Sequence, residues 1–351
     1  MTALTRRIRR ASAIAVALAA GSTLALAGTA TADPGRPSVR AGDSAPLVTG
    51  LYQSAYSERN HVLWATSAVG RPPVTTSRLV KVDPRTLKAE AAYTPPVTSQ
   101  ETGAVEAVYG VAVDDEHNTV WTTNTRNDSV AVYSQRTGEH LATLPGVKHA
   151  REVVVDERHH LAWASGFGDG SIVAFDTRTY KEKRRTTVEG ASPAGIAVNE
   201  HTGTAYATDL AHDRIIEVSP RATAPRLIPA GDGPISVALA ADGRTAYSAD
   251  QAAGTVSVID LRKGAVTKTV PTGAGTLSVA VDRRSGRVLA ANRTAATVTV
   301  VDPRRGAVVD TVTTGANPNH IEVADGAAYV VEKSASGPEG QDLLHRLRLG
   351  R

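Results

Sequence analysis

Gly203–Asp209 reads GTAYATD, and close copies of this stretch recur along the chain. GRTAYSAD starts at Gly243, and NTVWTTN starts at Asn118. Each copy is a short run of β-branched, aromatic and small residues that follows a glycine or asparagine, a pattern typical of a strand after a tight turn. The recurrence indicates a protein built from structural repeats.

A short Val/Ala-rich run precedes each copy and sets the period of the repeat. Its equivalent positions are spaced by 42, 43, 41, 42 and 42 residues, and they are Gly110, Glu152, Gly195, Ser236, Ser278 and His320. A weaker copy at Gln53 makes seven. Four short strands in each repeat predict an all-β fold, a seven-bladed β-propeller of four-stranded antiparallel blades. One blade cannot bury both of its faces, so the chain repeats until the ring closes.

The second strand of each repeat carries a tetrapeptide similar to Tyr-Val-Thr-Asn. The seven tetrapeptides begin at Trp64, Trp121, Trp163, Tyr206, Tyr247, Leu289 and Tyr329. On these residues the chain resembles the YVTN-family, or YncE-like, propellers of the WD40-like/YVTN repeat-like superfamily. The resemblance covers almost all of the chain after its first 32 residues. It implies an extracytoplasmic protein, and it leaves the function open because related propellers include binding scaffolds and a few enzymes.

The first 32 residues have the pattern of a secretory signal peptide. Four arginines precede an apolar stretch, which ends at the small-residue site Ala30-Thr31-Ala32. We expect export by the general secretory route or the twin-arginine route, with cleavage near Ala32. The product should be a secreted protein without a membrane span. Residues 33–43 are expected to be a disordered linker, and residues 44–351 the propeller.

Charge and cysteine content narrow the function classes. The formal charge of the whole chain is +4, but its 39 basic residues include the four leader arginines, so 35 basic and 35 acidic residues remain after cleavage. This balance gives no support to nucleic-acid binding. The chain has no cysteine, which rules out disulfides. Stability must therefore come from the core.

The seventh repeat is one strand short, and the chain start is expected to complete it. Leu343–Leu349 supplies its third strand, close to the end of the chain. The stretch APLVTG, Ala45–Gly50, resembles the fourth strands of other repeats, and it is expected to close the ring. Deleting it would expose an edge strand that could pair with other chains.

Polar residues at the starts of the first strands are the candidate ligand-binding set. They should surround the upper mouth of the channel, on the face with the strand two to strand three connections. The candidates are Gln53, Tyr109, His149, Arg151, Glu152, Asn319 and His320. An acid, an arginine and two histidines could bind an anion or a metal ion, or transfer protons; the alternative is that they only cap loops. Long insertions on the same face of repeats one and seven are expected to form a wall beside this mouth.

A metal-assisted lactonase or lyase is the second hypothesis. It would require carboxylates around a divalent cation in the channel, and the candidates are Glu152, Glu322 and Glu332. This set is too small to predict a catalytic or metal residue. The pair His159–His160 lies in a lower turn, where exposure is expected rather than metal binding. No cofactor is predicted, and a channel-bound divalent cation stays open.

A third hypothesis is polyanion or nucleic-acid binding through basic lower turns. These turns carry Arg85, Arg136, Arg178, Arg262, Lys263, Arg304 and Arg305. Acidic residues share the lower face, and aromatic residues for base stacking are few. The first hypothesis is therefore a secreted, monomeric, non-catalytic scaffold whose upper face binds a protein, peptide, glycan or small ligand.

Overall fold

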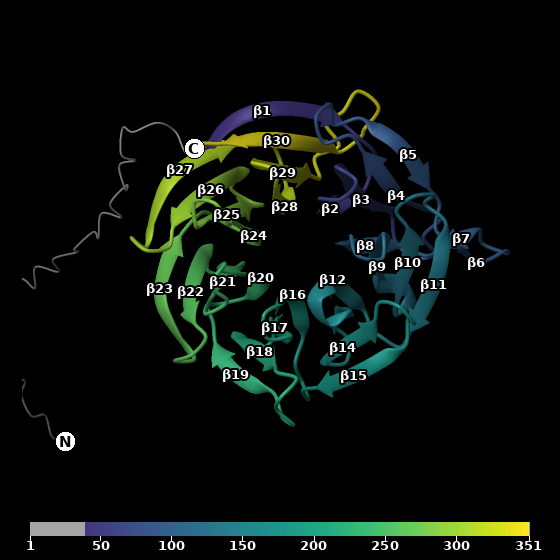
Figure 1. Cartoon of the computed structure of the whole chain (residues 1–351). Coiled ribbons are helices and arrows are strands. Elements are labelled where there is room, and N and C mark those ends of the chain that lie inside the picture. Colours follow the sequence, from purple (N-terminus) through teal and green to yellow (C-terminus); the bar gives the residue numbers. More distant parts are fainter. Residues whose placement is uncertain (1–38, 351) are drawn as a thin grey trace, which may run out of the picture. The chain divides into compact units, whose positions relative to one another are not determined.

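The computed structural model describes residues 39–350, which form a ring of four-stranded antiparallel sheets (Figure 1). There are seven such sheets within this range, as the repeat spacing predicts. The innermost strand of each blade faces the central axis, and the outermost strand covers the rim. The expected leader, residues 1–32, lies outside the described residues.

Blades 1–3 are formed by residues 51–187. Blade 1 contains β2 (Leu51–Ser57), β3 (Val62–Val69), β4 (Thr76–Val82) and β5 (Ala89–Tyr93). Blade 2 contains β8 (Val108–Asp114), β9 (Thr119–Asn124), β10 (Ser129–Ser134) and β11 (His140–Pro145), with the 3-10 turn η1 (Thr125–Asn127). Blade 3 contains β12 (Ala150–Asp156), β13 (Leu161–Gly166), β14 (Ser171–Asp176) and β15 (Glu182–Thr187), with η2 (Glu157–His159).

Blades 4–6 are formed by residues 193–313. Blade 4 contains β16 (Pro193–Asn199), β17 (Thr204–Asp209), β18 (Arg214–Val218) and β19 (Arg226–Pro229). Blade 5 contains β20 (Pro234–Leu239), β21 (Thr245–Asp250), β22 (Thr255–Asp260) and β23 (Ala265–Pro271). Blade 6 contains β24 (Thr276–Asp282), β25 (Arg287–Asn292), β26 (Thr297–Asp302) and β27 (Ala307–Thr313).

Blade 7 joins the two ends of the described chain. It contains β28 (Pro318–Ala324), β29 (Ala327–Glu332) and β30 (Leu343–Leu349), and its outer strand is β1 (Val39–Pro46). β1 pairs antiparallel with β30, from Val39 opposite Leu349 to Pro46 opposite Leu343. Closure by a strand from the chain start is therefore confirmed.

The position of the closing strand differs from the prediction. It ends at Pro46, so most of Ala45–Gly50 is the connection into blade 1, and residues 39–43 belong to the blade rather than to a linker. Most of β1 is exposed, and its register shifts between Arg40 and Asp43. A polar, bulged outer strand lacks the apolar alternation by which strands are recognised.

The core lies between the blades. Second strands are buried at nearly every position because both of their faces pack against neighbouring blades. Trp64, Trp121 and Trp163 are essentially inaccessible to solvent in these layers. In the lower turns, Asp83, Asp176, Asp260 and Asp302 accept backbone N–H groups, and these bonds stabilise the turns.

Side-chain hydroxyls connect the inner strands of blades 1–4. The third residue of the tetrapeptide there is a serine or threonine, and it accepts the N–H of the first strand of its own blade where the register shifts. Thr123 also donates to the carbonyl of Arg151 in the next blade at 3.0 Å, and Ser165 to that of Ala194 at 2.6 Å. Blades 5–7 have Ala249, Ala291 and Val331 at this position.

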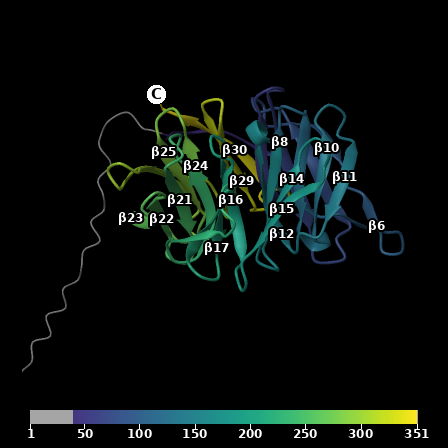
Figure 2. The same ribbon diagram turned by 60° about the horizontal axis from the view of Figure 1, so that its bottom comes forward.

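A small hairpin of β6 (Val97–Ser99) and β7 (Ala104–Val105) connects blades 1 and 2 and projects from the outer edge of the ring (Figure 2). Within residues 39–350 no helix has the length and apolar character needed to cross a membrane.

Candidate functional site

One residue per blade forms a ring of side chains around the channel, which we call the neck ring. Its members are equivalent in the repeat, and they are Gln53, Gly110, Glu152, Gly195, Ser236, Ser278 and His320. Four of them, Glu152, Ser236, Ser278 and His320, line both an upper cavity of about 330 Å³ and a lower cavity of about 680 Å³. The neck ring therefore separates two chambers of one channel.

Neck-ring side chains accept hydrogen bonds from the next blade. The edge of each inner strand faces the channel, so some of its N–H groups have no partner within the sheet. The N–H of Val111 donates to Gln53 Oε1 at 3.2 Å, and that of Ser54 donates to His320 Nδ1 at 3.3 Å. Ser236, Ser278 and Glu152 accept equivalent bonds from Val279, Ile321 and Ile196. These residues therefore contribute to blade contacts, the structural role that the sequence left open.

His320 keeps one donor for the channel. Since Nδ1 accepts the bond from Ser54, the proton of the neutral ring belongs on Nε2. Burial lowers the pKa of His320 to about 4. At neutral pH this side chain is thus an uncharged donor.

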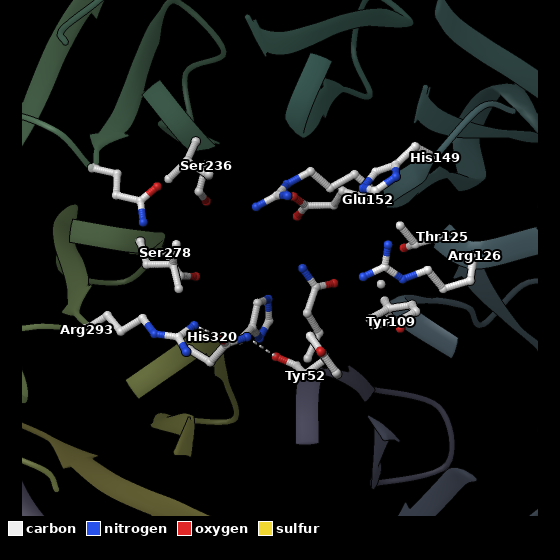
Figure 3. A pocket seen from close by; sticks show the side chains of 17 residues that line it. Tyr52, Tyr109, Thr125, Arg126, His149, Glu152, Ser236, Ser278, Arg293 and His320 are labelled. Carbon is white, nitrogen blue, oxygen red and sulfur yellow. Dashed lines mark hydrogen bonds between the residues drawn. The ribbon is translucent and has the colours of Figure 1, made fainter. Parts of the chain in front are cut away.

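All seven candidates from the sequence line the upper cavity. Gln53, Glu152 and His320 belong to the neck ring, and Tyr109, His149, Arg151 and Asn319 lie above it. Figure 3 shows Glu152 and His320 approaching the cavity from different blades. The structure therefore brings the set together, while ligand binding by these residues remains a prediction.

Three arginines line this cavity, and two of them were not among the candidates. Arg126 comes from η1, Arg293 follows β25, and both reach inward from opposite sides (Figure 3). Arg151 comes from β12. Among the described residues, none of the three guanidinium groups forms a salt bridge, whereas other arginines do. The arginines leave the upper cavity with unpaired positive charge.

Neighbouring side chains hold the arginines in place. Arg293 Nη1 donates to Asn319 Oδ1 at 2.8 Å, and Asn319 Nδ2 donates to the carbonyl of Tyr52 at 2.7 Å. The guanidinium carbon of Arg151 lies 5.5 Å from the ring centre of Phe167. These contacts fix two of the charges and leave several N–H donors for a ligand.

Two titratable groups respond to this environment. Burial raises the pKa of Glu152 to about 7, and the charge of Arg151 opposes that rise. Burial lowers the pKa of His149, and Arg126 and Arg151 lower it further. A neutral His149 can form hydrogen bonds and adds no further positive charge to the cavity.

Apart from Gly110, the other lining residues are aromatic, apolar, hydroxyl-bearing or amide-bearing. Tyr52 and Tyr109 pack edge to face, with ring centres 4.4 Å apart. Ile235 and Leu277 line the cavity from blades 5 and 6. The cavity therefore combines a cationic part with an apolar part.

Several cavity residues that were not among the candidates lie just after a tetrapeptide in the sequence. Thr125, Gln251 and Arg293 each come directly after the tetrapeptide at the end of a second strand, and Arg126 comes one residue later. The same position holds Phe167 beneath Arg151, and Lys333, whose Nζ lies 3.7 Å from the ring centre of Tyr52. Examining the residue after each tetrapeptide would have found Thr125, Gln251 and Arg293, but not Arg126.

The expected wall beside the mouth is absent from the cavity lining. Neither the β6–β7 hairpin nor the loop between β29 and β30 contributes a residue to the upper cavity. The hairpin lies at the periphery instead, in both views of the ring (Figures 1 and 2). The hairpin therefore does not form the expected wall, and for the loop between β29 and β30 that expectation stays a prediction.

The enzyme hypothesis gains few ligands from the structure. Glu152 and Glu322 reach the channel, but Glu332 is buried in β29 next to His345. Across residues 39–350, the cluster of three His, Asp or Glu side chains with metal-binding spacing is found on the lower face, outside the channel. The upper cavity instead presents arginines.

Comparisons with known proteins name no family. No protein-family model matches the chain, and a search of curated proteins finds no match. The strand order itself shows a seven-bladed propeller, a fold that commonly serves as a binding scaffold.

Proposed function

We propose that this propeller is a non-catalytic binding scaffold whose upper cavity holds a small organic anion. The observation that carries the proposal is the convergence of Arg126, Arg151 and Arg293 on one cavity without salt-bridge partners among the described residues. Guanidinium groups bind carboxylates through paired N–H bonds, and such bonds are stronger than those between neutral groups. An anion there would be bound from several blades at once.

The dimensions and lining of the cavity support a small ligand with an apolar body. A volume of about 330 Å³ is at the lower end of the range of ligand pockets. Ile235 and Leu277 offer apolar surface across from Arg126 and Tyr109. The neutral donors of His320 and Gln53 lie at its base. We infer a compact carboxylate with an apolar side rather than a long polymer.

The proposal can be tested with a set of small carboxylates of graded size. Thermal shift would rank them, and calorimetry would measure affinity for the best one. Arg126→Ala and Arg293→Ala should each weaken binding at least about tenfold, because each removes a charged donor. Arg262→Ala, which removes the same charge from an exposed lower turn, should change affinity less than about twofold.

Two results would contradict the proposal. One is that no small carboxylate binds the wild-type protein. The other is that Arg262→Ala weakens binding as much as Arg126→Ala, since the effect would then come from overall charge rather than from the cavity.

The other hypotheses receive less support. A lactonase or lyase would need a divalent cation in the channel, and three arginines above two carboxylates disfavour a cation there. Polyanion binding through the lower arginines meets an opposing field, because acidic residues line the lower cavity.

We also propose that the protein works outside the cytoplasm as a YVTN-like propeller. The basic and apolar pattern of residues 1–32 and the seven tetrapeptides support this assignment. Amino-terminal sequencing of protein recovered from the culture medium tests the expected cleavage near Ala32. Recovery of the uncleaved chain from the cytoplasm alone would contradict it.

A further inference from the structure

A cluster of metal-binding side chain types lies on the lower face, where blades 2 and 3 meet. Glu116 and His117 belong to the turn between β8 and β9, and His160 belongs to the turn between β12 and β13. One ligand atom from each of the three lies within 4.8 Å of the others. The upper-cavity proposal does not involve this cluster.

His117 has the arrangement of an oriented metal ligand. Its Nδ1 lies 2.8 Å from Oδ2 of Asp114, a carboxylate without solvent exposure. Donation from Nδ1 to this carboxylate leaves the lone pair on Nε2. Histidine ligands of metal ions commonly have such a carboxylate on the other ring nitrogen, which fixes the tautomer and the ring orientation.

His160 crosses to the neighbouring blade. Its Nδ1 lies 2.7 Å from Oε2 of Glu116, and its Nε2 contacts Arg178. His160 has a backbone φ of 55° at the end of its turn, where blade 2 has Asn118 with a φ of 57°. A histidine at this position thus connects the two blades through a histidine–carboxylate pair.

The charges around the cluster favour a cation. Asp114, Asp115 and Glu157 lie beside it, and Glu157 Oε1 accepts the N–H of Asp115 at 2.6 Å. Arg178 is the opposing charge in contact with His160, and its exposed side chain can turn into solvent.

We propose that Glu116, His117 and His160 bind a zinc ion that connects blades 2 and 3. Two imidazoles and one carboxylate leave a fourth position for water, as in zinc sites open to solvent. Ligand atoms of a tetrahedral zinc ion lie about 3.3 Å apart, so the side chains must close by up to about 1.5 Å. Zinc would replace the proton between His160 Nδ1 and Glu116, and the ring proton would move to Nε2. Arg178 would then lose its acceptor and swing away.

Zinc titration of the tag-free chain against a chromogenic chelator tests the site, with cobalt absorption as a second readout. We expect one zinc ion per chain, and at least tenfold weaker binding in His117→Ala and in His160→Asn. Asparagine is chosen because Asn118 has the same backbone conformation in blade 2. Arg178→Ala should bind zinc more tightly, because it removes the competing donor and its charge.

His159→Ala is the matched control. His159 Nδ1 also contacts an aspartate, Asp156, at 2.8 Å, but His159 is outside the cluster. It should bind zinc as the wild type does, and melting curves without zinc would verify that every variant is folded. The proposal is overturned if the wild type binds no stoichiometric zinc, if folded His117→Ala and His160→Asn retain wild-type affinity, or if His159→Ala loses as much.

Discussion

The two chambers of the channel share seven inner strands but carry opposite charge. Three arginines and one glutamate line the upper chamber. Six carboxylates and two arginines line the lower one, and the carboxylates are Glu58, Asp115, Glu152, Glu157, Glu200 and Glu322. The strands themselves are mostly apolar, so most of the contrast arises in the turns at either end. A balanced overall charge can therefore conceal two strong local fields.

The largest effect on the free energy of unfolding is expected at Asp342, which joins the loop between β29 and β30 to the start of β2 on the upper face. Asp342 accepts the N–H groups of Gly50 and Leu51 at 2.8 and 2.9 Å and that of Ala335 at 2.9 Å. Asp342→Ala leaves these donors unpaired and should cost about 3 kcal/mol of unfolding free energy in urea denaturation.

The lower-face comparison for this variant is Asp83→Ala. Asp83 accepts two N–H groups in an exposed turn, where water can replace the carboxylate. Its loss should cost about 1 kcal/mol or less. Equal losses of unfolding free energy in the two variants would show that Asp342 stabilises the protein no more than Asp83 does.

An intermediate effect is expected within the lower chamber. Glu322 lies two residues after the neck-ring residue of its blade, and the other six blades have alanine or valine at this position. Burial raises its pKa to about 7, so the folded state binds its proton more tightly than the unfolded chain does. The resulting stabilisation is present below the ordinary carboxyl pKa and is lost as pH rises through 7.

Glu322→Gln should therefore raise the unfolding free energy by about 1–2 kcal/mol at pH 8, because glutamine cannot ionise. At pH 4 it should change little. Denaturation of both proteins at the two pH values measures the difference. A variant that is less stable than the wild type at pH 8 would show that the carboxylate is favourably bound.

The smallest effect is expected at the neck ring, and it rests on the proposed anion site. Ionised Glu152 repels an anion, so affinity should rise about threefold as pH falls from 8 to 6 through its pKa of about 7. Burial lowers the pKa of His320 to about 4, so His320 stays neutral in this range, and burial also lowers the pKa of His149.

In calorimetry, Glu152→Gln should abolish this pH dependence, while Glu322→Gln, below the neck ring, should retain it. If Glu152→Gln kept the wild-type profile, the titrating group would have to be another residue, and the role of Glu152 would be lost.

The sequence predicted the ring well because each blade repeats the same packing problem. The tetrapeptides located the second strands, and Leu343–Leu349 was placed with the observed bounds. The bounds of β1 were not predicted because an outer strand needs few apolar residues, and only Val39 within it is buried.

The candidate site was predicted in part for the same reason. Residues on inner strands, such as Gln53 and Glu152, follow the repeat and were found from spacing alone. Arg126 lies in a turn whose direction no periodicity encodes. The contact between His160 and Glu116 joins two blades, so it could not be read from the pair His159–His160, for which exposure was expected rather than metal binding.

Ring closure by β1 also has a consequence for the order of folding. Val39 and Leu349 pair although about 310 residues separate them. Closing a flexible loop of that length costs roughly 5 kcal/mol of chain entropy. Blades 1–6 are each made from contiguous chain and can form without this cost. Blade 7 must wait until its neighbours have brought the two ends together, so we expect the ring to close last and to open first at the seam between β1 and β30.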